Sequence, residues 1–306
     1  MAGPSLWKEW TPAKTKTRGF CLKERVLSYL VYGLSTVIGI IAFLYPFFLP
    51  EVGKNAAMGM AHGQDAPLLL TVMVGICFGA MLLEVQVQAA GAKLVALVGI
   101  LVSINAVLRF AEVAVPGPGG FSPIFFLILV TGYIYGGGFG FLMGVATLLV
   151  SAIITASAGP WLPYQMFTAG WVGMSAPLAR PLVRLVHGEG RWREVLILAA
   201  FGGLWGLLYG AIMNIWFWPF SVGSPDQMWH AGMSWLDTLK TYAVFYMATS
   251  FVWDVLRLGG NALLTLAFGL PTLRVLRRFK TRFAFDYRPG LAASPGNVNP
   301  MGDPQI

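Results

Sequence analysis

The sequence predicts an all-α integral membrane protein of about eight transmembrane helices. Of its 306 residues, 57% are hydrophobic and only 11% are charged, whereas a soluble globular protein carries about 25% charged residues. The apolar residues gather in long runs, and at roughly 20 residues per crossing the chain has room for several helices and little else. The basic residues stand in short clusters between these runs. Together these three observations exclude a soluble domain.

Eight apolar runs, bounded by glycine, proline or charge, mark the predicted helices: residues 28–49, 67–86, 91–110, 121–135, 138–157, 164–186, 195–217 and 238–270. The first run is too long for the apolar region of a signal peptide, so we expect it to remain as a helix. The chain from 113 to 179 contains no charged residue or histidine. Within it we expect turns at the glycine and proline clusters 136–138 and 159–163, because irregular backbone is tolerated only at the bilayer surface or inside protein. The fourth run is short, which leaves open whether it spans the bilayer.

The distribution of basic residues predicts the topology. With eight crossings and a cytoplasmic N-terminus, 17 of the 21 Lys and Arg residues fall on the cytoplasmic side, as the positive-inside rule requires. The other side receives only Lys54, Arg109 and Lys240, while Arg257 falls within a helix. We therefore expect both termini in the cytoplasm, with a basic N-terminal segment (1–27) and a disordered C-terminal tail (284–306).

The sequence lacks the common motifs of nucleotide hydrolysis, metal binding and nucleophilic catalysis. It has no G-x-x-x-x-G-K-[ST] motif for ATP hydrolysis by a P-loop, and neither H-E-x-x-H nor G-x-S-x-G occurs. The three histidines lie in separate predicted loops. Cys21 and Cys77 provide neither a disulfide framework nor a metal-ligand spacing. We expect no catalytic residue, no metal, no cofactor and no nucleic-acid partner.

Two predicted helices carry a face of unusual composition. On the last helix a polar face has members spaced 4, 3 and 4 apart: Ser250, Asp254, Arg257 and Asn261. Charged groups at membrane depth are costly and normally face a bundle interior or a cavity. Asp254 and Arg257 therefore form either a structural salt bridge or a polar wall beneath a substrate cavity. On the third helix the same spacing relates small residues, which let another helix approach closely: Ala92, Ala96, Gly99 and Ser103. This stripe serves either internal packing or the docking of another subunit.

Aromatic and amide side chains crowd the non-cytoplasmic side of the predicted bundle. Any one of them is an ordinary residue of the interfacial belt, but their convergence predicts a pocket for a flat polar ligand. The candidate binding residues are Phe121, Ser122, Trp161, Tyr164, Gln165, Asn214, Trp216 and Trp218.

Two segments between residues 119 and 144 carry a family resemblance: Gly-Gly-Phe-Ser-Pro-Ile-Phe-Phe, and Gly-Tyr-Ile-Tyr-Gly-Gly-Gly-Phe-Gly-Phe-Leu-Met-Gly. Together with Gly-Pro-Trp-Leu-Pro-Tyr-Gln-Met at 159–166, Asn-Ile-Trp-Phe-Trp-Pro-Phe at 214–220 and Ala-Thr-Ser-Phe-Val-Trp-Asp at 248–254, they resemble the substrate-binding S components of energy-coupling factor (ECF) vitamin transporters. The similarity covers about residues 90–283. It divides the chain into two additional N-terminal helices (28–88) and a six-helix core (89–283).

The resemblance implies a subunit of an ECF-type ABC importer in a prokaryotic plasma membrane. Such a subunit captures a vitamin outside the cell and works with a transmembrane coupling protein and two cytoplasmic ATPases. In that family a small-residue stripe of A-x-x-x-A type on the first core helix docks the coupling protein, and Ala92 and Ala96 occupy that place. The subgroup suggests cobalamin or a related corrinoid, with thiamine or a related heterocycle as the alternative. The competing hypotheses are an intramembrane enzyme that uses Asp254 and Arg257, and a scaffold that transports nothing.

Overall fold

The computed structural model describes residues 18–48, 66–87, 91–114, 121–221 and 223–283, and within these ranges all regular structure is helical. This confirms the predicted fold class. The helices are α1 (Arg18–Phe48), α2 (Ala66–Val87), α3 (Gly91–Ala114), α4 (Ile124–Tyr135), α5 (Gly137–Ile154), α6 (Leu162–Ser175), α7 (Ala179–Leu185), α8 (Trp192–Phe217), α9 (Trp235–Thr249) and α10 (Phe251–Phe283), with two short 3₁₀ helices, η3 (Ala176–Leu178) and η4 (Trp218–Phe220). The predicted tail 284–306 and most of the N-terminal segment lie outside the described residues.

Five helical stretches in the described part of the chain are long and apolar enough to cross a membrane: Leu30–Phe48, Val95–Ala114, Gly137–Ile154, Trp192–Phe220 and Phe251–Thr281. The fourth predicted run forms α4, which has only 12 residues. At 1.5 Å per residue it is about 18 Å long, short of the roughly 30 Å hydrocarbon core. This length alone does not span a bilayer.

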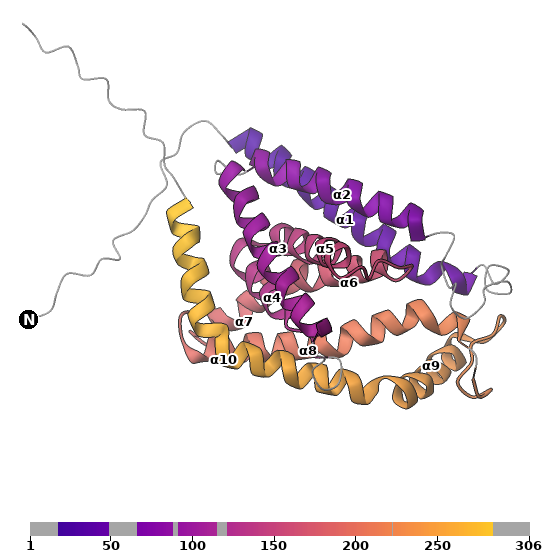
Figure 1. The fold of residues 1–306 in the computed structure, drawn as a ribbon. Helices are drawn as coiled ribbons and strands as arrows, with labels where there is room; N and C mark the ends of the chain where they lie inside the picture. The colour runs from indigo at the N-terminus through magenta and orange to yellow at the C-terminus, as the bar shows by residue number, and fades with distance from the viewer. Residues whose placement is uncertain (1–17, 49–65, 88–90, 115–120, 222, 284–306) are drawn as a thin grey trace, which may run out of the picture.

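Two of the predicted runs are wrong as single helices. The run 164–186 divides into α6, η3 and α7, because prolines at 177 and 181 interrupt the helical hydrogen bonding. The run 238–270 divides into α9 and α10 at Ser250, whose backbone leaves the helical region at φ −132° and ψ −22°. The helix after this break continues to Phe283, beyond the predicted end, and contains Pro271. Figure 1 shows α10 bending sharply toward its C-terminal end, as a proline inside a helix favours.

Helix α4 is the centre of the bundle, and every residue from Ile124 to Ile134 is buried. It runs antiparallel to α8, since Phe125 packs edge-on against Tyr209 at 4.6 Å while Leu129 contacts Gly202 near the other end. The helix stops at Gly136, whose φ of 118° lies in the left-handed region that glycine adopts without strain. The predicted turn at 136–138 is therefore present.

Glycines let the neighbouring helices approach closely. Gly140 of α5 lies against Gly173 of α6, and Gly144 lies against Ala169, so these two helices are antiparallel. A side chain at any of these glycines would collide with the backbone of the other helix. This is the close packing that small residues permit between membrane helices.

The bundle has two chemically different ends. At one end the described residues include Phe47, Trp161, Trp218 and Tyr242, and we call this the aromatic end. At the other, Arg180, Arg191 and Arg193 lie near the C-terminal part of α10, and we call this the basic end. In Figure 1 the first residues of α1 and the last residues of α10 lie on the same side of the bundle, which is the basic end. An even number of crossings produces this arrangement.

Candidate binding site at the aromatic end

A pocket of about 300 Å³ with a mixed polar and apolar lining lies where α8 ends. Its walls come from the end of α8, Ser221, the 223–228 segment, α9 and the α9–α10 break. The lining residues are Asn214, Phe217, Ser221, Gly223, Gln227, Met228, Phe245, Thr249 and Ser250. Aromatic and thioether groups thus alternate with amides and hydroxyls, the composition of pockets that bind small organic ligands. Asn214 is one of the lining residues, and its buried Nδ2 has no hydrogen-bond partner among the described residues.

The Asp254–Arg257 ion pair lies one helical turn from two of the lining residues and is not itself part of the lining. Asp254 packs so closely on Gly210 that any side chain at that glycine would overlap its carboxylate. Asn214 lies one helical turn beyond Gly210, and Ser250 lies one turn before Asp254, so both stand directly above the pair. The ion pair is buried, with side-chain exposures of 3% for Asp254 and 17% for Arg257.

Three further contacts fix the polar face of α10 against α8. The Arg257 guanidinium lies 5.6 Å from the ring centre of Tyr209 and 3.5 Å from the carbonyl oxygen of Gly206. One turn on, Asn261 donates to the carbonyl oxygen of Gly202 at 3.3 Å. The face predicted from the 4, 3, 4 spacing therefore meets a stripe of glycines on α8. This arrangement favours the salt-bridge interpretation of Asp254 and Arg257.

A second ion pair, which the sequence analysis did not single out, stands close to the first. Arg109 pairs with Glu112 at the end of α3, and Ser122 donates to the same carboxylate at 2.6 Å. The i, i+3 spacing of Arg109 and Glu112 is visible in the sequence, but the predicted third helix ends at residue 110, between the two. Ser122 thus belongs to this ion cluster and does not line the pocket.

The aromatic residues predicted at the site surround it rather than line it. Trp218 is buried between Phe47, Tyr242 and Phe245, and its indole nitrogen donates to the carbonyl oxygen of Gln227 at 2.8 Å. Tyr164 is fully buried, and its ring lies 6.0 Å from that of Trp216. Of these side chains, Trp218 packs against a lining residue of the pocket, Phe245.

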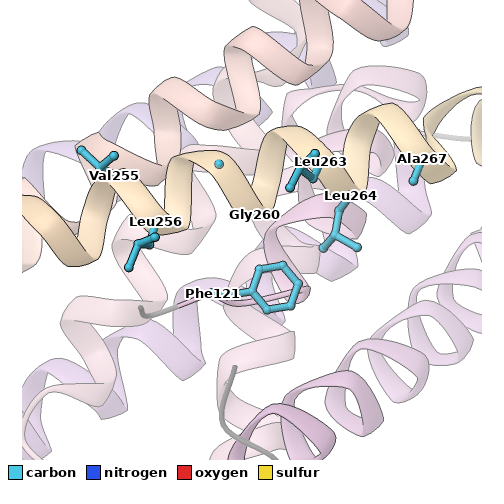
Figure 2. Close-up of a pocket in the computed structure, with 8 residues that line it drawn as sticks. Phe121, Val255, Leu256, Gly260, Leu263, Leu264 and Ala267 are labelled. Atoms are coloured by element: carbon cyan, nitrogen blue, oxygen red, sulfur yellow. The ribbon is translucent and has the colours of Figure 1, made fainter. Parts of the chain in front are cut away.

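Three of the predicted residues lie away from the pocket. Trp161 is 40% exposed and packs over Gly159 at the start of α6, and the neighbouring Gln165 is half-buried. Phe121 lies against Gly260, further along α10, where it lines an apolar hollow of about 500 Å³. Figure 2 shows its ring beside the α10 backbone among aliphatic side chains. The structure therefore brings together Asn214 and Ser250 from the predicted set, with Trp216 and Trp218 behind them.

The small-residue stripe of α3 faces outward. Ala96, Gly99 and Ser103 are exposed, and a side chain at Gly99 would meet no atom of the described chain within 4 Å; the side chain of Ala92 lies outside the described residues. Beside the stripe is an apolar groove of about 670 Å³ between α3 and the bent part of α10, lined by Ala96, Leu97, Ile100, Leu101, Ile104, Leu127, Phe268, Pro271, Thr272, Val275, Leu276 and Phe279. The stripe is not used for packing among the described helices.

At the basic end a hydrogen-bonded network fixes the other end of α4. The buried carboxylate of Glu194 pairs with Arg277 and accepts from the Tyr133 hydroxyl at 2.6 Å and from the Gly190 amide at 2.8 Å. Arg180 and Lys280 donate to the last carbonyls of α4, and burial lowers the pKa of Arg180 from its usual value. These cations thus cap a helix C-terminus, where positive charge is favourable.

The described residues contain no group of three His, Cys, Asp or Glu placed to hold a metal ion. A family model described as "ECF transporter, substrate-specific component" matches residues 93–268. No curated protein and no solved structure matches the chain.

Proposed function

The chain belongs to the substrate-specific components of ECF transporters, and from that premise we propose that it captures a vitamin in the pocket above Asp254 and Arg257. It is a multi-pass membrane subunit that binds a transport substrate, and the family works with a membrane coupling protein and ATPases. In this proposal the aromatic end faces outside and the basic end faces the cytoplasm, as the positive-inside rule requires for the arginines near α7 and at the end of α10.

The observation that carries the proposal is the unpaired amide of Asn214 in the wall of the pocket at the aromatic end. A buried donor without a partner costs about 1–3 kcal/mol, and a ligand acceptor recovers this energy. Gln227 and Ser250 supply further polar groups, while Phe217 and Phe245 offer aromatic surface for a planar ring. A vitamin heterocycle combines these two properties.

Cavity size bears on the choice of vitamin. The volume of about 300 Å³ lies at the lower end of the range of ligand pockets, roughly 300–1,000 Å³. Thiamine or a related heterocycle fits this volume more readily, whereas cobalamin or another corrinoid requires the walls formed by 223–228 and α9 to move apart. We therefore place the smaller heterocycle first.

The α3 stripe supports a docking role toward the coupling protein. Its residues Ala96, Gly99 and Ser103 remain exposed, and the apolar groove beside them extends to Phe268 and Phe279 of α10. Small residues next to an apolar groove permit the close approach of an apolar helix. The groove lies toward the basic end, where a partner that contacts cytoplasmic ATPases belongs.

The competing functions have less support. In the enzyme hypothesis Asp254 has to act on a substrate, yet its Oδ1 is paired with Arg257 and its carboxylate is buried against Gly210. In the scaffold hypothesis the pocket at Asn214 has no role.

Calorimetric titration of the full-length protein in detergent with thiamine and with cyanocobalamin tests the proposal. We expect one of them to bind, and Asn214→Ala to weaken that binding about tenfold because a buried hydrogen bond is lost. Trp161→Ala, which changes an exposed aromatic outside the pocket, is the matched control and should change affinity less than about twofold. Equal losses in the two variants would move the site toward α6.

A further inference from the structure

Helix α1 lies outside the family match, which begins at residue 93, yet it packs directly on the core. Gly39 touches α6 so closely that an added side chain would lie 2.7 Å from the Trp171 ring and 2.8 Å from the Phe167 ring. One turn on, Phe43 is buried edge-on against Tyr164 at 5.1 Å. Helix α1 is therefore closely packed against α6 of the core along this face.

At the aromatic end this contact reaches the wall of the candidate pocket. The Phe47 ring lies 5.7 Å from that of Trp218 and 5.2 Å from that of Trp229, in a T-shaped arrangement with the latter. The indole nitrogen of Trp218 in turn donates a hydrogen bond to the carbonyl oxygen of Gln227. Gln227 and the next residue, Met228, line the pocket, so the segment 223–229 has the pocket on one side and the Phe47–Trp218 pair on the other.

We propose that Phe47 is a positioning residue for substrate binding, because it fixes the 223–229 segment from behind and so sets the shape of the pocket. Phe47 does not line the pocket itself, and it acts through its contacts with Trp218 and Trp229. This inference rests on the proposed function for its effect on a ligand. It gives the additional N-terminal helix a role that the core alone does not provide.

A spin label on the pocket wall tests the mechanical part of the inference without any ligand. Gly223 lines the pocket, is exposed, and has open space around its α-carbon, so Gly223→Cys accepts a nitroxide, with Cys21→Ala and Cys77→Ala as background. In the full-length protein we expect Phe47→Ala to increase the nitroxide mobility in the room-temperature spectrum. Phe47→Tyr should restore the wild-type spectrum because the ring is retained. Phe47→Leu, which keeps apolar volume, replaces the alanine variant if that variant does not fold.

Phe48→Ala is the matched control, since Phe48 is 62% exposed and its ring faces Trp235 of α9 at 6.1 Å instead of the segment 223–229. It should leave the spectrum unchanged. In titrations with thiamine and cyanocobalamin, Phe47→Ala should weaken the binding seen for the wild type about tenfold, the order expected for two lost aromatic contacts, and Phe48→Ala less than about twofold.

The two proposals fail in different ways. An unchanged spectrum in the folded Phe47→Ala protein, or unchanged affinity despite a mobile label, overturns the role of Phe47. If the wild type binds neither vitamin, the proposed substrate class is wrong, while the spectra still decide whether α1 fixes the pocket wall.

Discussion

Removing the acidic partner of the ion pair beneath the pocket should destabilise the whole bundle. Asp254→Ala leaves the guanidinium of Arg257 in a buried position, because the side-chain exposure of Arg257 is only 17%. Breaking a buried pair in this way costs about 3–5 kcal/mol. Arg257 keeps the Gly206 carbonyl at 3.5 Å and the Tyr209 ring at 5.6 Å, so we expect the lower end of that range, about 3 kcal/mol.

The assay is reversible unfolding in mixed micelles with increasing mole fraction of SDS, followed by circular dichroism. Asp254→Ala combined with Arg257→Leu should lose clearly less stability than the sum of the two single changes, since no unpaired charge remains. The matched control is Glu189→Ala, which removes the exposed partner of Arg184; this pair has an N–O distance of 3.8 Å and exposures of 70% and 66%. Such a pair contributes about 0–1 kcal/mol.

A loss for Asp254→Ala as small as that for Glu189→Ala would refute the structural role of the pair. Additive effects in the double variant would refute it equally, because they would show that Asp254 and Arg257 act independently. Asp254 would then be free for another role, and the enzyme hypothesis would gain support.

The remaining predictions concern coupling, topology and the basic end. Gly99→Leu should abolish transport and copurification of the coupling protein, while ligand binding to the isolated subunit persists. Gly75→Leu on α2, another open position, should leave transport and copurification intact. Retained copurification in Gly99→Leu would contradict docking at the stripe. A cysteine at Gly223 should react with an impermeant thiol reagent from outside intact cells and one at Glu189 should not, so the reverse labelling would invert the topology. Glu194→Gln should lower the free energy of unfolding by about 2–4 kcal/mol in the same micelle assay. Arg277 loses its charged partner in this variant, while the new amide keeps the Tyr133 contact. A change below about 1 kcal/mol would show that the network does not contribute to stability.

The sequence was sufficient for the fold class because hydrophobic runs and basic clusters are local signals. The break at Ser250 was not predictable in this way, since no proline or glycine marks it. The polar face of α10 was found from its spacing, but its partner was missed. Gly202, Gly206 and Gly210 on α8 repeat every four residues, and this signal would have identified the surface against which Asp254 and Asn261 pack.

The binding site was only partly predictable for a physical reason. Asn214 was identified as an amide near the end of a predicted helix, and Ser250 as a member of the polar face of the last helix. Gln227 and Met228 instead enter the pocket through the fold of a segment that contacts Trp218 and Phe47. Such contacts join residues far apart in the chain, and no spacing rule relates them. Conversely, Trp161 and Phe121 have the composition of binding residues but lie on other surfaces.

Mass spectrometry of small molecules that copurify with the detergent-solubilised protein tests the central claim most directly. We expect a vitamin heterocycle that the wild type retains and that Asn214→Leu loses, because an apolar side chain replaces the amide at the pocket wall. The absence of any such molecule from wild-type protein purified from vitamin-supplemented cells, or its equal retention by Asn214→Leu, would contradict the account.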